Sequence, residues 1–146
     1  MARNDVMELF RAAVRHDWDD VNRLTATLDK QGWPGGVQGI TAVFALTVDR
    51  RFTPGYDVRQ ISEFVAEVRG QLSKEDDVDP LAAEGLIRSV LGETELAEGI
   101  PADIAMHAQI VLALKMIEAE GLSDLDLERF LDEAETLVSR WSQSGS

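Results

Sequence analysis

The sequence contains no cysteine among its 146 residues. Disulfides, thiolate zinc sites, thiol nucleophiles and iron–sulfur clusters are therefore excluded. Long apolar runs are also missing, and the opening stretch MARNDVMELF carries Asp5 and Glu8 where a signal peptide has an apolar segment. We therefore expect a cytoplasmic protein that does not associate with membranes.

Basic residues are scarce, with 14 Lys and Arg against 27 Asp and Glu, a net charge of −13. Phosphate binding depends on clustered Lys and Arg, so we expect no nucleic-acid partner. The charge is uneven along the chain, because residues 1–73 carry a net −1 and residues 74–146 a net −12. Such a field can steer a basic partner, and it is equally typical of a helical surface that is charged for solubility.

Strand signals are almost absent, since no segment alternates apolar and polar residues between Asn-Gly or Asp-Gly turns. Apolar residues recur instead at steps of three or four, and the composition of 45% hydrophobic and 28% charged residues is that of a globular protein. We predict an all-α fold, a single compact domain of six or seven helices over residues 1–141. The last residues, 142–146, are predicted to be a disordered tail.

Capping and stop residues divide this pattern into helices. Asp17 is an N-cap signal, so two short helices hinged at His16–Asp17 are favoured over one long helix. Gly32 and Gly121 suit helix ends, and Asp57 and the Asp79-Pro80 pair suit helix starts.

Two segments, 37–50 and 101–120, have few polar positions and are predicted to be central helices, the second being the longest of the molecule. Trp18 and Trp141 lie on apolar stripes and are expected in the core. The other expected core residues are Phe10, Val14, Leu24, Val43, Phe44, Leu46, Ile61, Val65, Leu86, Ile110, Val111, Leu114, Phe130 and Leu137.

A Gly-x-Pro motif occurs twice, as Gly32-Trp33-Pro34 and, 67 residues later, as Gly99-Ile100-Pro101. Each precedes an apolar segment and then an amphipathic one, which is compatible with two three-helix repeats whose central helices pair. The alternative is that Gly-x-Pro is common helix punctuation. The run AAVRHDWDDVNRL also resembles the helix–turn–helix step of helical repeat proteins such as ankyrin repeats. The Thr-Pro-Leu-His signature of ankyrin repeats is missing, and the resemblance implies no function.

The two histidines are the side chains that ordinarily titrate near neutrality. His16 precedes Asp20, and Asp103 precedes His107, by four residues, so each pair shares a face if its helix is continuous. His107 lies in an apolar segment, where a histidine satisfied within the core is the favoured interpretation and a metal or catalytic site with Asp103 the alternative.

Other catalytic and cofactor signatures are missing. The acidic runs starting at Asp17 and Asp124 lack the glycine that a calcium-binding EF-hand loop needs at its sixth position. No P-loop, GxSxG, HExxH or GxGxxG pattern occurs, so we expect no cofactor.

The function that these features favour is a non-catalytic helical interaction module, such as an adaptor, an inhibitor or an immunity-type protein, that presents its acidic second half to a basic protein partner. The alternative is a small enzyme or a metal- or ligand-binding protein that uses Asp103 and His107. A homodimer through the stripe of Val6, Phe10 and Val14 is compatible with both. The expected interaction residues are Trp33, Glu118, Asp126, Glu128, Asp132, Glu133 and Glu135.

Overall fold

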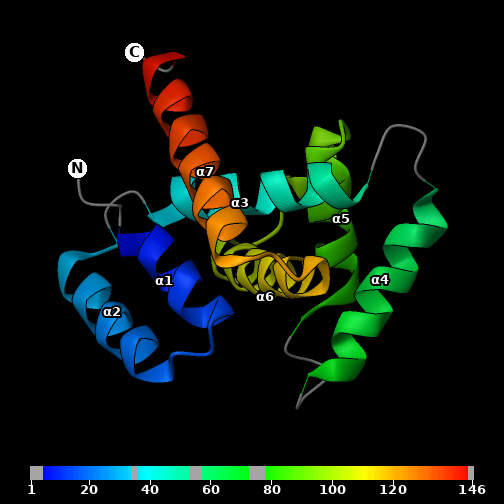
Figure 1. Ribbon diagram of the computed structural model, residues 1–146. Coiled ribbons are helices and arrows are strands. Elements are labelled where there is room, and N and C mark those ends of the chain that lie inside the picture. The colour runs from blue at the N-terminus through cyan, green and yellow to red at the C-terminus, as the bar shows by residue number, and fades with distance from the viewer. Residues whose placement is uncertain (1–4, 34–35, 53–56, 73–77, 145–146) are drawn as a thin grey trace. The chain divides into compact units, whose positions relative to one another are not determined.

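A computed structural model describes residues 5–33, 36–52, 57–72 and 78–144 of the chain (Figure 1). Over these ranges the chain forms seven α-helices and one short 3-10 helix and no strand, which confirms the all-α prediction. None of the described helices is long and apolar enough to cross a membrane. The elements are α1 (Asp5–Val14), α2 (Trp18–Gln31), α3 (Gly36–Arg51), α4 (Val58–Gln71), α5 (Pro80–Val90), η2 (Thr94–Ala97), α6 (Ala102–Glu120) and α7 (Asp124–Ser144).

The chain divides into two compact units, one formed by Met1–Val43 with Ile117–Ser146 and the other by Phe44–Met116. The division falls within α3 and within α6, so these two helices carry the chain from one unit into the other and back. The units are therefore not the two successive halves that a sequence repeat would give. The helix order does not match a repeat of three helices either, because α1 to α4 precede residue 73.

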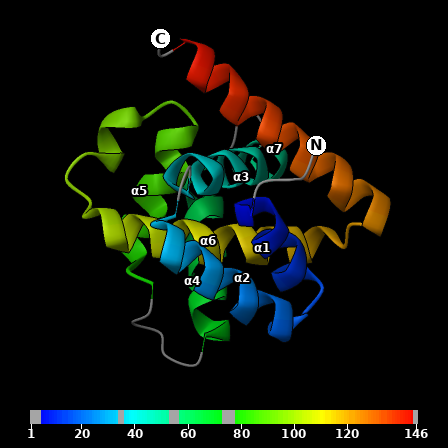
Figure 2. The same ribbon diagram turned by 90° about the vertical axis from the view of Figure 1, so that its left-hand side faces the viewer.

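The first unit is built around α1, which packs against both α2 and α7. Figure 1 shows α1 between these two helices, and Figure 2 shows α1 and α2 side by side from a second direction. The buried apolar residues of these three helices include Val6, Met7, Phe10, Leu24, Leu28, Leu127, Phe130, Leu131 and Ala134. Of the stripe predicted for a homodimer, Val6 and Phe10 are therefore already covered by the chain's own residues, and Val14 is half-buried.

The predicted break between the first two helices is confirmed. His16 adopts a left-handed backbone conformation with φ 59°, and the side chain of Asp17 accepts a hydrogen bond from the backbone N–H of Asp20. A residue in this conformation cannot continue a right-handed helix. His16 and Asp20 therefore do not share a helix face, because the continuous helix that this pairing requires is not formed.

In the second unit α4 packs against α5, and α5 packs against η2. Asp57 begins α4 with a capping box, in which its carboxylate accepts a backbone N–H and the Gln60 side chain accepts the N–H of Asp57. Asp79 caps α5 by accepting from the N–H of Ala82, with Pro80 in the first turn. Both helix starts agree with the sequence prediction.

The predicted core is right in part. Eight of its residues are buried: Phe10, Leu24, Val43, Phe44, Ile61, Val65, Leu86 and Phe130. Six are only half-buried: Val14, Leu46, Ile110, Val111, Leu114 and Leu137. Three of these lie in α6, where the buried side chains are Ala108, Leu112, Ala113, Met116 and Ile117. An apolar helix does have a buried face, but its composition does not show which one.

Three further predictions need correction. The longest helix is α7, with 21 residues against 19 in α6. α7 continues to Ser144, so residues 142–144 of the expected tail are helical, while 145–146 lie outside the described residues. Trp18 is 57% exposed, because at about 100° per residue it lies roughly 100° around α2 from the buried Leu24 and Leu28.

Candidate functional site

The first unit brings two turns of the chain together. Arg15, which precedes α2, lies with its Nη2 3.5 Å from Oδ1 of Asp124 at the start of α7. His16 Nε2 lies 3.9 Å from Oε1 of Glu118 near the end of α6. We call Arg15, His16, Trp18, Glu118 and Asp124 the turn cluster.

An exposed tryptophan is the most distinctive member of this cluster. The Trp18 ring meets the His16 ring edge to face, with 5.6 Å between centroids and an interplanar angle of 88°. This contact supports one side of the indole, yet more than half of the residue stays accessible. Leu125, next to Asp124 in the chain, is 61% exposed. Large accessible apolar side chains are typical of binding surfaces.

Carboxylates belong to the turn cluster and adjoin it in the chain. Besides Glu118 and Asp124, the exposed carboxylates within two positions of cluster members in the chain include Asp17, Asp19 and Asp126. Arg15 offsets part of this charge, since it lies within 4 Å of both Asp124 and Glu128. The cluster therefore combines an accessible aromatic ring with an excess of negative charge.

Glu128, one of the expected interaction residues, is engaged inside the unit. Arg11 of α1 donates to its Oε2 through Nη2 at 2.7 Å, and the Arg11 Nε lies 2.6 Å from its Oε1. Both side chains are largely covered, with exposed fractions of 26% and 30%. This pair joins α1 to α7 and gives Glu128 a structural role.

The other acids of α7 do not form one face. At about 100° per residue, Asp132 and Glu135 lie on the same flank of the helix as Glu128. Asp126 and Glu133 lie two turns apart on the opposite flank, where Arg129 Nη1 is 4.0 Å from Asp126 Oδ1.

The two units do not differ in net charge as the two halves of the sequence do. The first unit has seven bases and fourteen acids and the second seven and thirteen, for net charges of −7 and −6.

Trp33, the aromatic that the sequence singles out, is half-buried at the end of α2. Its indole Nε1 donates to Oδ1 of Asp29 at 2.7 Å, and its backbone has φ 54°. This hydrogen bond fixes the ring against its own helix. Pro34, which follows, lies outside the described residues.

Asp103 and His107 lie one turn apart in the first half of α6, and both are exposed. The expectation of a core histidine with a buried partner is therefore wrong, because α6 buries a face that does not include His107. Within the described ranges no three His, Asp or Glu side chains gather closely enough to hold a metal ion.

Sequence reasoning placed Trp18 in the core and so missed the turn cluster. The signal was present, because a tryptophan directly after an N-cap stands in the first turn of a helix, where its neighbours in the core are fewest. The sequence matches no protein-family model and no curated protein with which it was compared, and the fold matches no solved structure. Function must therefore be inferred from the surface chemistry of this chain.

Proposed function

We propose that this protein is a non-catalytic interaction module, of the adaptor, inhibitor or immunity type, whose turn cluster binds a basic protein partner. The observation that supports this proposal is the exposed Trp18 among the carboxylates of Glu118 and Asp124. Tryptophan is enriched among the residues that dominate binding energy at interfaces, and its ring face attracts Lys and Arg cations.

The two components of the cluster have different roles in this proposal. The apolar ring supplies most of the affinity, because its area leaves water on binding. The carboxylates raise the association rate and select for a basic surface. This division differs from the sequence hypothesis, in which Trp33 is the anchor, since Trp33 is hydrogen-bonded to its own helix and less accessible.

The test is capture of a partner from the native lysate at low salt, followed by measurement of its association and dissociation rates with purified variants. Trp18→Ala is expected to weaken binding at least tenfold, mainly through faster dissociation. Trp33→Ala is the matched control, because it removes the other tryptophan at an end of α2 and is expected to leave the affinity within about twofold.

The charge component is tested with the double variant Glu118→Gln/Asp124→Asn. We expect slower association at low salt and little difference above roughly 0.15 M, where the Debye length is about 8 Å. Glu95→Gln/Glu98→Gln, which removes two charges near η2 in the second unit, is the matched control.

Failure to capture a basic protein at low salt, or equal binding by Trp18→Ala and the unaltered chain, would show that the proposal is wrong. The alternative occupant of this surface is a second copy of the chain. Light scattering of the purified protein at several concentrations would detect the resulting dimer.

A further inference from the structure

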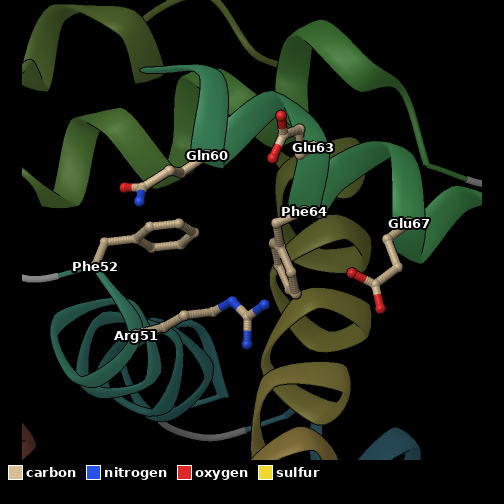
Figure 3. A pocket seen from close by; sticks show the side chains of 6 residues that line it. All are labelled: Arg51, Phe52, Gln60, Glu63, Phe64 and Glu67. Atoms are coloured by element: carbon tan, nitrogen blue, oxygen red, sulfur yellow. The ribbon is translucent and has the colours of Figure 1, made fainter. Parts of the chain in front are cut away.

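The second unit contains a cavity of about 410 Å³ where the end of α3 faces α4. Four of its lining residues, Gln60, Glu63, Phe64 and Glu67, follow one stripe of α4 at steps of three and four. Arg51 and Phe52 complete the lining, as Figure 3 shows. The volume lies within the range of about 300–1,000 Å³ that is typical of small-molecule sites.

Two phenylalanines give this cavity fixed walls. The rings of Phe52 and Phe64 meet edge to face, with centroids 6.0 Å apart and an interplanar angle of 73°. They are only 6% and 5% exposed, so most of each ring is held in the core of the unit. The polar ends of the other lining residues therefore provide most of the chemistry that a ligand meets.

Arg51 is positioned by one of these rings. The centre of its guanidinium lies 4.4 Å from the centroid of Phe64 (Figure 3). This cation–π contact holds the guanidinium beside the ring, and a guanidinium carries several N–H groups that can donate to a ligand. This geometry suits the recognition of a carboxylate, which accepts two parallel N–H bonds.

Glu63 and Glu67 bring negative charge to the same cavity. Both are exposed and one turn apart, a spacing at which like charges destabilise a helix. Within the described part of the chain neither carboxylate pairs with a base, and Arg51 pairs with neither of them. The cavity thus carries one cation and two anions, and these form no ion pair with one another within the described residues.

We propose that this cavity binds a small zwitterionic ligand, with its carboxylate on Arg51 and its ammonium group at Glu63 and Glu67. A ligand with a single charge would leave the opposite charge of the cavity unmatched and would be selected against. The proposal does not depend on the turn cluster, which lies in the other unit, and either can fail alone.

The test uses three zwitterions with increasing separation of charge, namely glycine, 4-aminobutanoate and 6-aminohexanoate, and two singly charged controls, butylamine and butanoate. Amide chemical shifts are followed by NMR during titration of the full chain. We expect at least one zwitterion to give saturable shifts at Arg51, Glu63 and Glu67, with an affinity at least tenfold above that of both controls.

Two variants locate the site. Arg51→Gln and Glu63→Gln/Glu67→Gln are each expected to weaken the binding of that zwitterion at least tenfold, and Arg51→Lys is expected to retain part of it, because the charge remains without the planar fork. Arg23→Gln and Glu95→Gln/Glu98→Gln are matched controls outside the cavity and should bind as the unaltered chain does.

Three results would overturn the proposal: no saturable shift with any of the three zwitterions, equal affinity for butylamine or butanoate, or equal weakening by the control variants. Circular dichroism verifies that each variant folds. If Arg51→Gln does not fold, Glu63→Gln/Glu67→Gln decides the outcome, since both side chains are exposed.

Discussion

Leu112 and Leu114 are only two residues apart in α6, yet their surroundings differ. Leu112 is completely buried, whereas Leu114 is half-buried. The sequence prediction placed Leu114 in the core. Both leucines belong to the same apolar run, and that run does not show which side of the helix is buried. The free energy of unfolding that is lost when a side chain is truncated depends on the cavity that remains. Truncating each of the two leucines therefore distinguishes the burial seen in the structure from the burial predicted from the sequence.

Leu112→Ala is expected to lower the free energy of unfolding by about 2–5 kcal/mol, the range for a fully buried leucine. Leu114→Ala should cost less than half as much, since water can reach the space that it vacates. Urea denaturation followed by circular dichroism measures both. Leu125→Ala, at a residue that is 61% exposed, is the control and should remain within about 0.5 kcal/mol of the unaltered chain. A larger loss for Leu114→Ala than for Leu112→Ala would contradict the burial pattern.

At the scale of the helix, two glycines that look alike in the sequence have opposite surroundings. A Cβ added at Gly85 of α5 would lie 3.1 Å from the backbone carbonyl oxygen of Leu96 in η2. A Cβ added at Gly70, near the end of α4, would meet nothing within 4 Å. α5 can therefore approach η2 closely because residue 85 has no side chain.

Gly70→Ala is expected to stabilise the protein by about 0.5 kcal/mol, because alanine restricts the unfolded chain and favours the helix. Gly85→Ala gains the same helix propensity, but its Cβ would lie too close to the backbone carbonyl oxygen of Leu96, which cannot rotate away. We therefore expect the free energy of unfolding to fall by about 1 kcal/mol. Thermal unfolding of the two variants provides the comparison. Stabilisation by Gly85→Ala would show that α5 and η2 do not approach so closely.

The helix boundaries were largely predictable, because the residues that set them act locally. Asp17, Asp57 and Asp79 cap helices through their own side chains and the next few N–H groups. The candidate sites were not predictable from the sequence, because they depend on contacts between residues that are far apart in the chain. Glu118 meets His16 from about a hundred positions away in the chain, and Arg51 of α3 meets Phe64 of α4. Neither contact leaves a periodic signal in the sequence.

At the scale of the whole molecule, we expect the two units to unfold together. The part of α3 in the first unit is Gly36–Val43, and the part of α6 is Ile117–Glu120. Isolated helices shorter than about 12 residues are marginal in water. We therefore expect each part to depend on the continuation of its helix in the second unit, in keeping with the prediction of a single domain over residues 1–141.

The distribution of tryptophan allows this prediction to be tested. All three tryptophans, Trp18, Trp33 and Trp141, belong to the first unit, and the last two are half-buried and should report its unfolding by fluorescence. Far-UV circular dichroism reports helices in both units. We expect the two signals to give the same midpoint, as they do for a cooperative two-state transition.

Leu112→Ala makes this comparison stricter, because its cavity lies in the second unit, which contains no tryptophan. If the helices that cross the division couple the units, this variant lowers the fluorescence midpoint as much as the circular dichroism midpoint. Phe130→Ala, which truncates a buried side chain of the first unit, is the reciprocal control and should also shift both signals together. A fluorescence midpoint that Leu112→Ala leaves unchanged, while the circular dichroism curve splits into two steps, would show instead that the chain contains two domains joined through α3 and α6.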